Sequence, residues 1–200
     1  SAQNLRYELT GRFANTEGVM KDDYRHRYSL GFKLDYHVNN SILVSNRTTY
    51  TEIKAQNTPY GSFAEYVTMN PYERMYNEDG TPNTDLAWDL DNPLYEASLG
   101  SYSRNGTNTF ANSTDIRWDI TNQFRLTGHF NITSQTGWKD IFRSPKSRDF
   151  KDITDLTKKG SSTQTDSRSV SYNANVVATF NHIFKDESLI SANAGWEINH

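Results

Sequence analysis

The sequence has no cysteine, no long apolar run and no excess of positive charge, and each absence excludes a class of protein. Without cysteine there are no disulfide frameworks, cysteine-ligated zinc sites or thiol nucleophiles. No run approaches the roughly 18 consecutive apolar residues that a membrane-spanning helix needs, and no charged start with an apolar centre marks a signal peptide. A net charge of -3 gives no electrostatic reason to expect binding of nucleic acid.

The chain combines low hydropathy with many aromatic residues. Only 34% of its 200 residues are hydrophobic, yet 13% are Phe, Trp or Tyr, and the mean hydropathy is -0.82. So polar a chain cannot fill an ordinary core, whereas disordered chains are poor in aromatic residues. The explanation must lie in where the apolar residues fall.

Apolar residues recur at every second position in about seven segments. Between Tyr28 and Val38 they occupy one parity, while polar residues such as Lys33 and Asp35 occupy the other. A period of two places successive side chains on opposite faces of a strand. The same pattern covers 5–13, 115–120, 124–133, 170–180 and 190–198, and 41–53 is assigned to a strand from its β-branched and aromatic content. The sequence therefore predicts an all-β, antiparallel fold.

The predicted connections alternate between short turns and long loops. The short ones are Asn39-Asn40, Thr121–Gln123 and Lys185–Ser188, with turn-forming Asn and Asp residues. The longer ones are Glu17–Asp23, a long loop at about 56–107 and a second at about 140–167. In an up-and-down sheet every second connection lies at the same end, so the long loops share one end. Outer-membrane β-barrels have this asymmetry, with short periplasmic turns and long extracellular loops.

The polar parity carries charges that would be costly in a dry core but are ordinary in a watery lumen. The lumen-facing candidates are Arg6, Glu8, Arg12, Asp115, Arg117, Asp119, Arg125 and His129. We therefore predict a segment of an antiparallel, up-and-down transmembrane β-barrel, with its apolar parity facing the lipid bilayer. A soluble β-sandwich that acts as a carbohydrate-binding module is the alternative, because its sheets also alternate.

The loop at about 56–107 contains four of the five prolines, which resist strand pairing. Ser62–Met69 is predicted to form a short helix within it. The loop is rich in aromatic residues, which either pack on one another or contact a ligand or partner. The candidates for such contact are Tyr66, Tyr72, Tyr76, Trp88 and Tyr95.

No G-x-G-x-x-G, P-loop, G-x-S-x-G or H-E-x-x-H motif is present, and the five histidines are scattered. We therefore predict no enzymatic activity, no cofactor and no metal site. Asn77–Gly80 and Asp89–Asn92 offer oxygen atoms of the kind that calcium binds, but both are interpreted more simply as turns.

Two loop motifs and one strand pair resemble a known family. They are Asn-Pro-Tyr-Glu-Arg-Met-Tyr-Asn-Glu-Asp-Gly at 70–80, Asp-Asn-Pro-Leu-Tyr-Glu-Ala at 91–97, and Ile116–Ile120 with Phe124–Leu126. These residues resemble the SusC/RagA family, the TonB-linked outer-membrane transporters of Bacteroidetes. The resemblance spans most of the chain, and the loop motifs are its most specific part. It implies a 22-stranded barrel that an amino-terminal plug occludes.

About seven strands cannot form such a barrel, and residues 1–200 show no plug-like segment or coupling motif. The resemblance thus implies that residues 1–200 are an internal part of one barrel domain in the bacterial outer membrane. The partners it implies are the lipid bilayer, a SusD-like surface lipoprotein, a transported oligosaccharide or peptide, and the TonB complex through segments outside these 200 residues.

Overall fold

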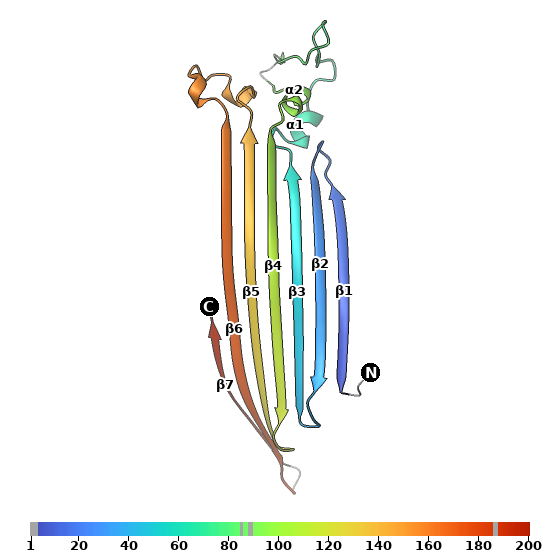
Figure 1. Cartoon of the computed structure of the whole chain (residues 1–200), viewed down its shortest axis with the longest axis vertical. Helices are drawn as coiled ribbons and strands as arrows, with labels where there is room; N and C mark the ends of the chain where they lie inside the picture. Colours follow the sequence, from blue (N-terminus) through green and yellow to red (C-terminus); the bar gives the residue numbers. More distant parts are fainter. Residues whose placement is uncertain (1–3, 85, 88–89, 186–187) are drawn as a thin grey trace.

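The computed structural model describes residues 4–84, 86–87, 90–185 and 188–200. Seven strands form one antiparallel sheet in chain order (Figure 1). They are β1 Leu5–Glu17, β2 Tyr24–His37, β3 Ile42–Asn57, β4 Tyr102–Asp119, β5 Phe124–Arg143, β6 Ser161–Ile183 and β7 Leu189–Asn199. The predicted all-β, up-and-down fold is confirmed. The sheet is open, with β1 and β7 at its edges.

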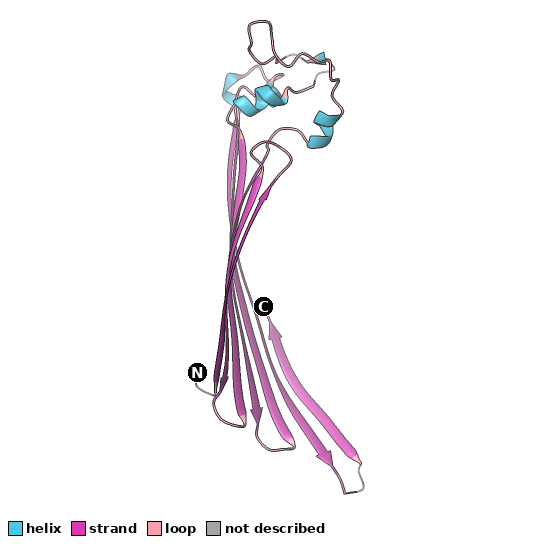
Figure 2. Cartoon of the chain, turned by 90° about the vertical axis from the view of Figure 1, so that its right-hand side faces the viewer, coloured by secondary structure: helices cyan, strands magenta, loops and turns pink. Residues whose placement is uncertain are grey.

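The sheet is a single layer. Figure 2 shows it almost edge-on, as one twisted layer with loops and short helices at one end. Among the described residues only two apolar side chains, Tyr60 and Leu86, are buried, and both belong to the loop between β3 and β4. A β-sandwich would bury its apolar parity beneath a second sheet, so the sandwich alternative is wrong for this part of the chain. No helix among these residues has the length and hydropathy required to cross a bilayer.

Strand register places the apolar parity of all seven strands on one side, which we call the apolar face. One cross-strand row on this face contains Leu5, Tyr36, Val44, Ile116, Gly128, Val176 and Trp196. Its side chains are open to the surroundings: Leu9 is 76% exposed and Trp196 is 64% exposed. We call the opposite side, which carries the charged parity, the polar face.

The apolar face contains a hydrogen-bonded group of polar side chains, formed by Asn46 and Thr48 of β3 with Asn112 and Thr114 of β4. Asn46 Nδ2 donates to Thr114 Oγ1 (2.8 Å), and Asn112 Nδ2 donates to Thr48 Oγ1 (2.7 Å). Because the four side chains satisfy one another, the group costs far less than isolated polar atoms on an apolar surface would. This group also explains why alternation is unclear over 41–53.

The long strands extend further than the alternation predicted. β2 begins at Tyr24, directly after the predicted connection Glu17–Asp23, although the alternation begins only at Tyr28. The second and third long connections span 58–101 and 144–160 rather than about 56–107 and 140–167. The added segments carry charged residues on both parities, with Arg25 and Lys139 on the polar parity and Asp166 and Arg168 on the apolar parity. The hydropathy signal therefore ends, while backbone hydrogen bonding to the neighbouring strands continues.

The turns confirm the predicted asymmetry between the two ends (Figure 1). At the short-turn end, Asn39 Oδ1 accepts a hydrogen bond from Ser41 N (2.8 Å), and Thr121 Oγ1 accepts from Phe124 N (3.0 Å). The predicted turn at Lys185–Ser188 includes residues 186–187, which lie outside the described residues. The loop end carries the helices α1 Phe63–Val67 and α2 Pro93–Ser98 and the 3-10 turns η2 Arg148–Phe150 and η3 Leu156–Lys158. Helix α1 lies within the predicted 62–69.

Candidate functional site

Helix α2 organises the loop between β3 and β4 through one buried side chain, Asn92. Its Oδ1 accepts from Leu94 N (2.9 Å) and caps the helix, which has Pro93 in its first turn. Its Nδ2 donates to Met75 O and to Asn83 O, both at 2.8 Å. Asn92 is fully buried, so this amide fixes three separate segments of the loop to one another.

Glu96 of α2 joins this loop to the connection between β5 and β6. The side chain is buried, and its Oε1 accepts a hydrogen bond from the backbone N of Arg148 (2.9 Å). The Arg148 guanidinium also contacts the loop between β3 and β4, because its Nε lies 3.2 Å from Asp91 Oδ1 and its Nη1 donates to Thr84 O. Tyr95 adds a further bond from its hydroxyl to Lys146 O (3.0 Å). The two long loops therefore form one hydrogen-bonded layer.

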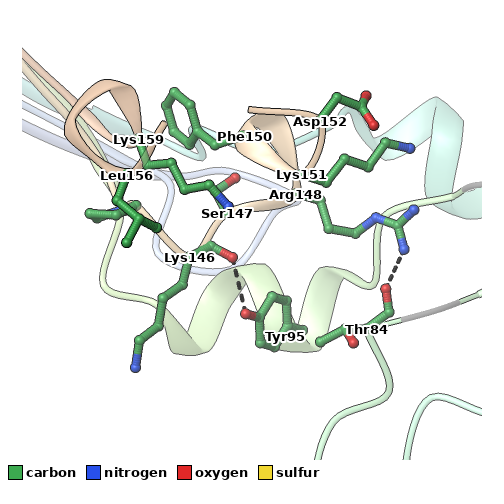
Figure 3. A pocket seen from close by; sticks show the side chains of 11 residues that line it. Thr84, Tyr95, Lys146, Ser147, Arg148, Phe150, Lys151, Asp152, Leu156 and Lys159 are labelled. Carbon is green, nitrogen blue, oxygen red and sulfur yellow. Dashed lines mark hydrogen bonds between the residues drawn. The ribbon is translucent and has the colours of Figure 1, made fainter. Parts of the chain in front are cut away.

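A pocket of about 830 Å³ lies where the two loops meet (Figure 3). In this view Lys159 and Leu156 lie on one side, Lys151 and Asp152 on the other, and Tyr95 and Thr84 below. Both hydrogen bonds drawn in the figure cross between the loops. The pocket thus has polar and apolar walls supplied by segments far apart in the sequence.

The five predicted contact aromatics have different environments. Tyr72 is 91% exposed and Tyr76 is also exposed, whereas Tyr66 is half-buried and its hydroxyl donates to Tyr60 O (3.2 Å). Trp88 lies outside the described residues, and Tyr95 lines the pocket. Of the four that the structure describes, it brings only Tyr95 into the pocket.

Tyr60 anchors the start of this loop. Its side chain is one of the two apolar groups that are buried among the described residues. Burial raises the pKa of its phenol, and the carboxylates of Asp22, Asp23 and Glu96 act in the same direction. The phenol is therefore neutral over a wide pH range and packs as an apolar group.

The two segments that offer calcium-type oxygen ligands, Asn77–Gly80 and Asp89–Asn92, use described carboxylates in hydrogen bonds and an ion pair within the loops. Asp79 Oδ1 accepts from Thr81 N (2.9 Å) and Thr81 Oγ1 (2.6 Å), and these bonds hold the pKa of the Asp79 carboxyl below its usual value. In the other segment Asp91 pairs with Arg148, and Asp89 lies outside the described residues. Among described side chains, no group of three or more His, Asp or Glu residues could hold a metal ion.

All eight predicted lumen-facing residues lie on the polar face. The register aligns three of them, Arg6, Asp115 and His129, in one row that crosses the whole sheet. The complete row is Arg6, Asp35, Ser45, Asp115, His129, Asn175 and Glu197. Seven strands thus each contribute a polar or charged side chain at the same level.

Neighbouring charges on this face pair with one another. Nδ1 of His129 lies 2.6 Å from Oδ1 of Asp115, and Ser45 Oγ donates to Asp35 Oδ1 (2.7 Å). Nearer the turns, Asp119 contacts both Arg117 (3.5 Å) and Arg125 (2.5 Å). The charged residues therefore form local pairs on an exposed polar face.

The fold has counterparts among solved structures, although no family model and no curated protein matches the chain. The RagAB peptide importer in the "closed-closed" state is similar at 15% sequence identity, and the RagAB peptide transporter at 14%. Each alignment has a TM-score of 0.75 and covers 98% of this chain. The likeness is one of fold. The chain spans 22% of the length of each chain it matches.

The RagAB structures carry names that describe transport, not catalysis. The loop layer contains the residues that sequence reasoning missed, namely Glu96, Lys146, Arg148, Phe150, Leu156 and Lys159. Glu96 belongs to the loop motif at 91–97, and the one sequence signal for the others was the density of Lys and Arg between Arg143 and Lys159.

Proposed function

We propose that this chain forms part of the wall of a bacterial outer-membrane β-barrel importer. The observation that carries the proposal is the exposed apolar face of a single-layer sheet. A contiguous apolar surface that extends across seven strands marks a contact with a membrane or with another protein. A bilayer covers such a face completely, while the opposite polar face lines a water-filled lumen.

The apolar face has dimensions that suit a bilayer. Its apolar stretch runs from Leu5 to Phe13 on β1 and from Val170 to Phe180 on β6, which is about the 9–11 residues a tilted transmembrane strand needs. The stretch also shifts between strands. On β1 the apolar stretch begins at Leu5, which lies in the same cross-strand row as Val176 of β6. On β6 the apolar stretch continues past this row to Phe180, which lies nearer the short turns. A shift in this direction across a sheet is expected when strands tilt within a barrel.

The polar face supports the role of lumen wall. Its charged residues concentrate toward the turn end, and the loop half of β6 instead presents hydroxyl groups: Ser161, Thr163, Thr165, Ser167, Ser169 and Ser171. Such a surface offers hydrogen bonds to a passing polar ligand without strong charge. The eight candidates from Arg6 to His129 accordingly line the lumen in this proposal.

The remaining strands, an amino-terminal plug and the TonB-contacting segment belong to parts other than these 200 residues. The open edges at β1 and β7 and the 22% coverage of the RagAB chains support this division. The transported ligand is an oligosaccharide or a peptide, delivered by a SusD-like surface lipoprotein that covers the loop end. The peptide transport in the names of both similar structures favours a peptide.

Protease access to intact cells tests this topology. The same tobacco etch virus protease site is inserted after Asp79, in an exposed loop turn, and separately after Asn122, in a short turn. We expect added protease to cut only the Asp79 insertion in intact cells and to cut both insertions after the outer membrane is opened. Cleavage at Asn122 with protection at Asp79 would invert the topology, and cleavage at both in intact cells would exclude a sealed membrane between them.

A further inference from the structure

The pocket between the two long loops allows a further inference, which rests on the proposed function. We propose that this pocket is a subsite for a carboxylate group of the transported ligand, with Lys159 as its principal cation. The proposal depends on the charges around the pocket, on the rigidity of its frame and on the apolar surface beside Lys159.

The pocket lining is rich in cations. Lys146, Arg148, Lys151 and Lys159 line it, against a single carboxylate, that of Asp152. Arg148 is engaged by Asp91 and Thr84. Lys159 is half-buried, and no carboxylate of the described residues lies within ion-pair distance of its amine. An ammonium group on a half-buried side chain without a counter-ion favours an anion from outside.

The position of Lys159 is fixed by the backbone on either side of it. Its N donates to Leu156 O (3.4 Å) at the end of η3. The next residue, Gly160, has a φ of 84°, and a Cβ there would lie 2.9 Å from Cγ of Pro145. Only glycine fits this close crossing of the two ends of the loop. Lys159 therefore stands on a constrained segment rather than on a mobile tip.

The frame of the pocket is held from the other loop. Glu96 accepts from Arg148 N, and Tyr95 donates to Lys146 O. Because these bonds join segments about fifty residues apart, the walls are in place before a ligand arrives, which lowers the ordering cost of binding. The side of the pocket with Lys159 also has Leu156 and Phe150 (Figure 3).

A carboxylate beside an apolar surface occurs in two candidate ligands, an acidic peptide and a sugar acid. Aspartyl or glutamyl side chains next to apolar residues present it in peptides, and uronic acids present it next to a ring face in oligosaccharides. Both would place the carboxylate at the Lys159 amine and the apolar part against Phe150 and Leu156. The shared chemistry is therefore a carboxylate-bearing, amphipathic ligand.

Binding to the purified full-length protein in detergent tests the subsite. The probes are the blocked tripeptide Ala-Asp-Phe against Ala-Asn-Phe, and digalacturonate against digalactose, with Kd measured by calorimetry. We expect one acidic probe to bind about tenfold more tightly than its neutral counterpart, as for a charge-assisted contact in a half-open pocket. The pair that shows the preference identifies the source of the carboxylate.

Two lysine variants separate the subsite from general charge. Lys159→Gln should abolish the preference, whereas Lys158→Gln should keep it, because Lys158 is exposed and pairs with Asp155 (3.7 Å). Equal binding of acidic and neutral probes, no binding of any probe, or a preference that survives Lys159→Gln would overturn the proposal. Any of these results with the expected protease pattern at Asp79 and Asn122 would leave the importer proposal intact.

Discussion

Replacing Phe32 by arginine should destabilise the folded protein in lipid vesicles by about 2–4 kcal/mol, the usual cost of a guanidinium at the lipid-facing midplane of a β-barrel. Phe32 lies on the apolar face of β2, between Leu9 of β1 and Thr48 of β3. No acidic side chain is paired with it in this row. The free energy of unfolding is measured by urea titration of the intact protein in vesicles.

The matched control is Thr49→Arg, one strand away on the polar face. Thr49 pairs with Gly31 and Ala111, so small neighbours leave room for the new side chain, and water in the lumen solvates its charge. We expect a change within about 0.5 kcal/mol, as for ordinary surface substitutions. A larger loss at Thr49 than at Phe32 would mean that the two faces have been assigned the wrong way round.

Asn92→Ala should open the loop layer while leaving the sheet intact. The substitution removes the α2 cap and the two bonds to Met75 O and Asn83 O. Caps and buried hydrogen bonds of this kind are each worth about 1 kcal/mol or more, so local opening should become easier by about 2–4 kcal/mol. Amide hydrogen exchange at Leu94 and Glu96 measures the change, and should accelerate at least about thirtyfold.

Asn70→Ala is the control for this prediction. Asn70 is exposed, and its Oδ1 accepts a single bond, from Tyr72 N (3.0 Å). Exchange at Leu94 and Glu96 should remain close to that of the unaltered protein. If Asn92→Ala and Asn70→Ala accelerate exchange equally, Asn92 does not organise the loop in the way its three contacts indicate.

The sheet could be predicted because its two faces differ. A period of two in the hydropathy located six strands, and β-branched and aromatic content located β3. Parity also placed every lumen-facing candidate on the polar face. The alternation could not locate the loop-side strand ends, because residues such as Asp166 and Arg168 place charges on the apolar parity and so remove the contrast between the two faces. In β3 the alternation of apolar and polar residues was unclear for a different reason. Asn46 lies on the apolar face, where its hydrogen bonds to Asn112 and Thr114 of the neighbouring strand make a polar side chain tolerable.

The candidate site was less predictable because it depends on contacts distant in sequence. Asp115 and His129 could be placed on one face by parity, but their pairing depends on the register set by the turn at 120–123. The aromatic content of the loop identified five candidates for contact with a ligand or partner, and one of them, Tyr95, lines the pocket. For Lys159 the sequence offered only the density of Lys and Arg at 143–159, because the pocket exists only where Glu96 meets Arg148 across 52 residues.

The central claim is that lipid covers the apolar face, and spin-label accessibility tests it most directly. Because these 200 residues contain no cysteine, single cysteines at 28–36 of β2 can each carry one label in the intact protein in vesicles. We predict that labels at Leu30, Phe32 and Leu34 are accessible to oxygen and protected from a water-soluble nickel complex, and that labels at Ser29, Lys33 and Asp35 show the reverse. Protection from both reagents at all three apolar positions, as inside a water-soluble core, would contradict the account.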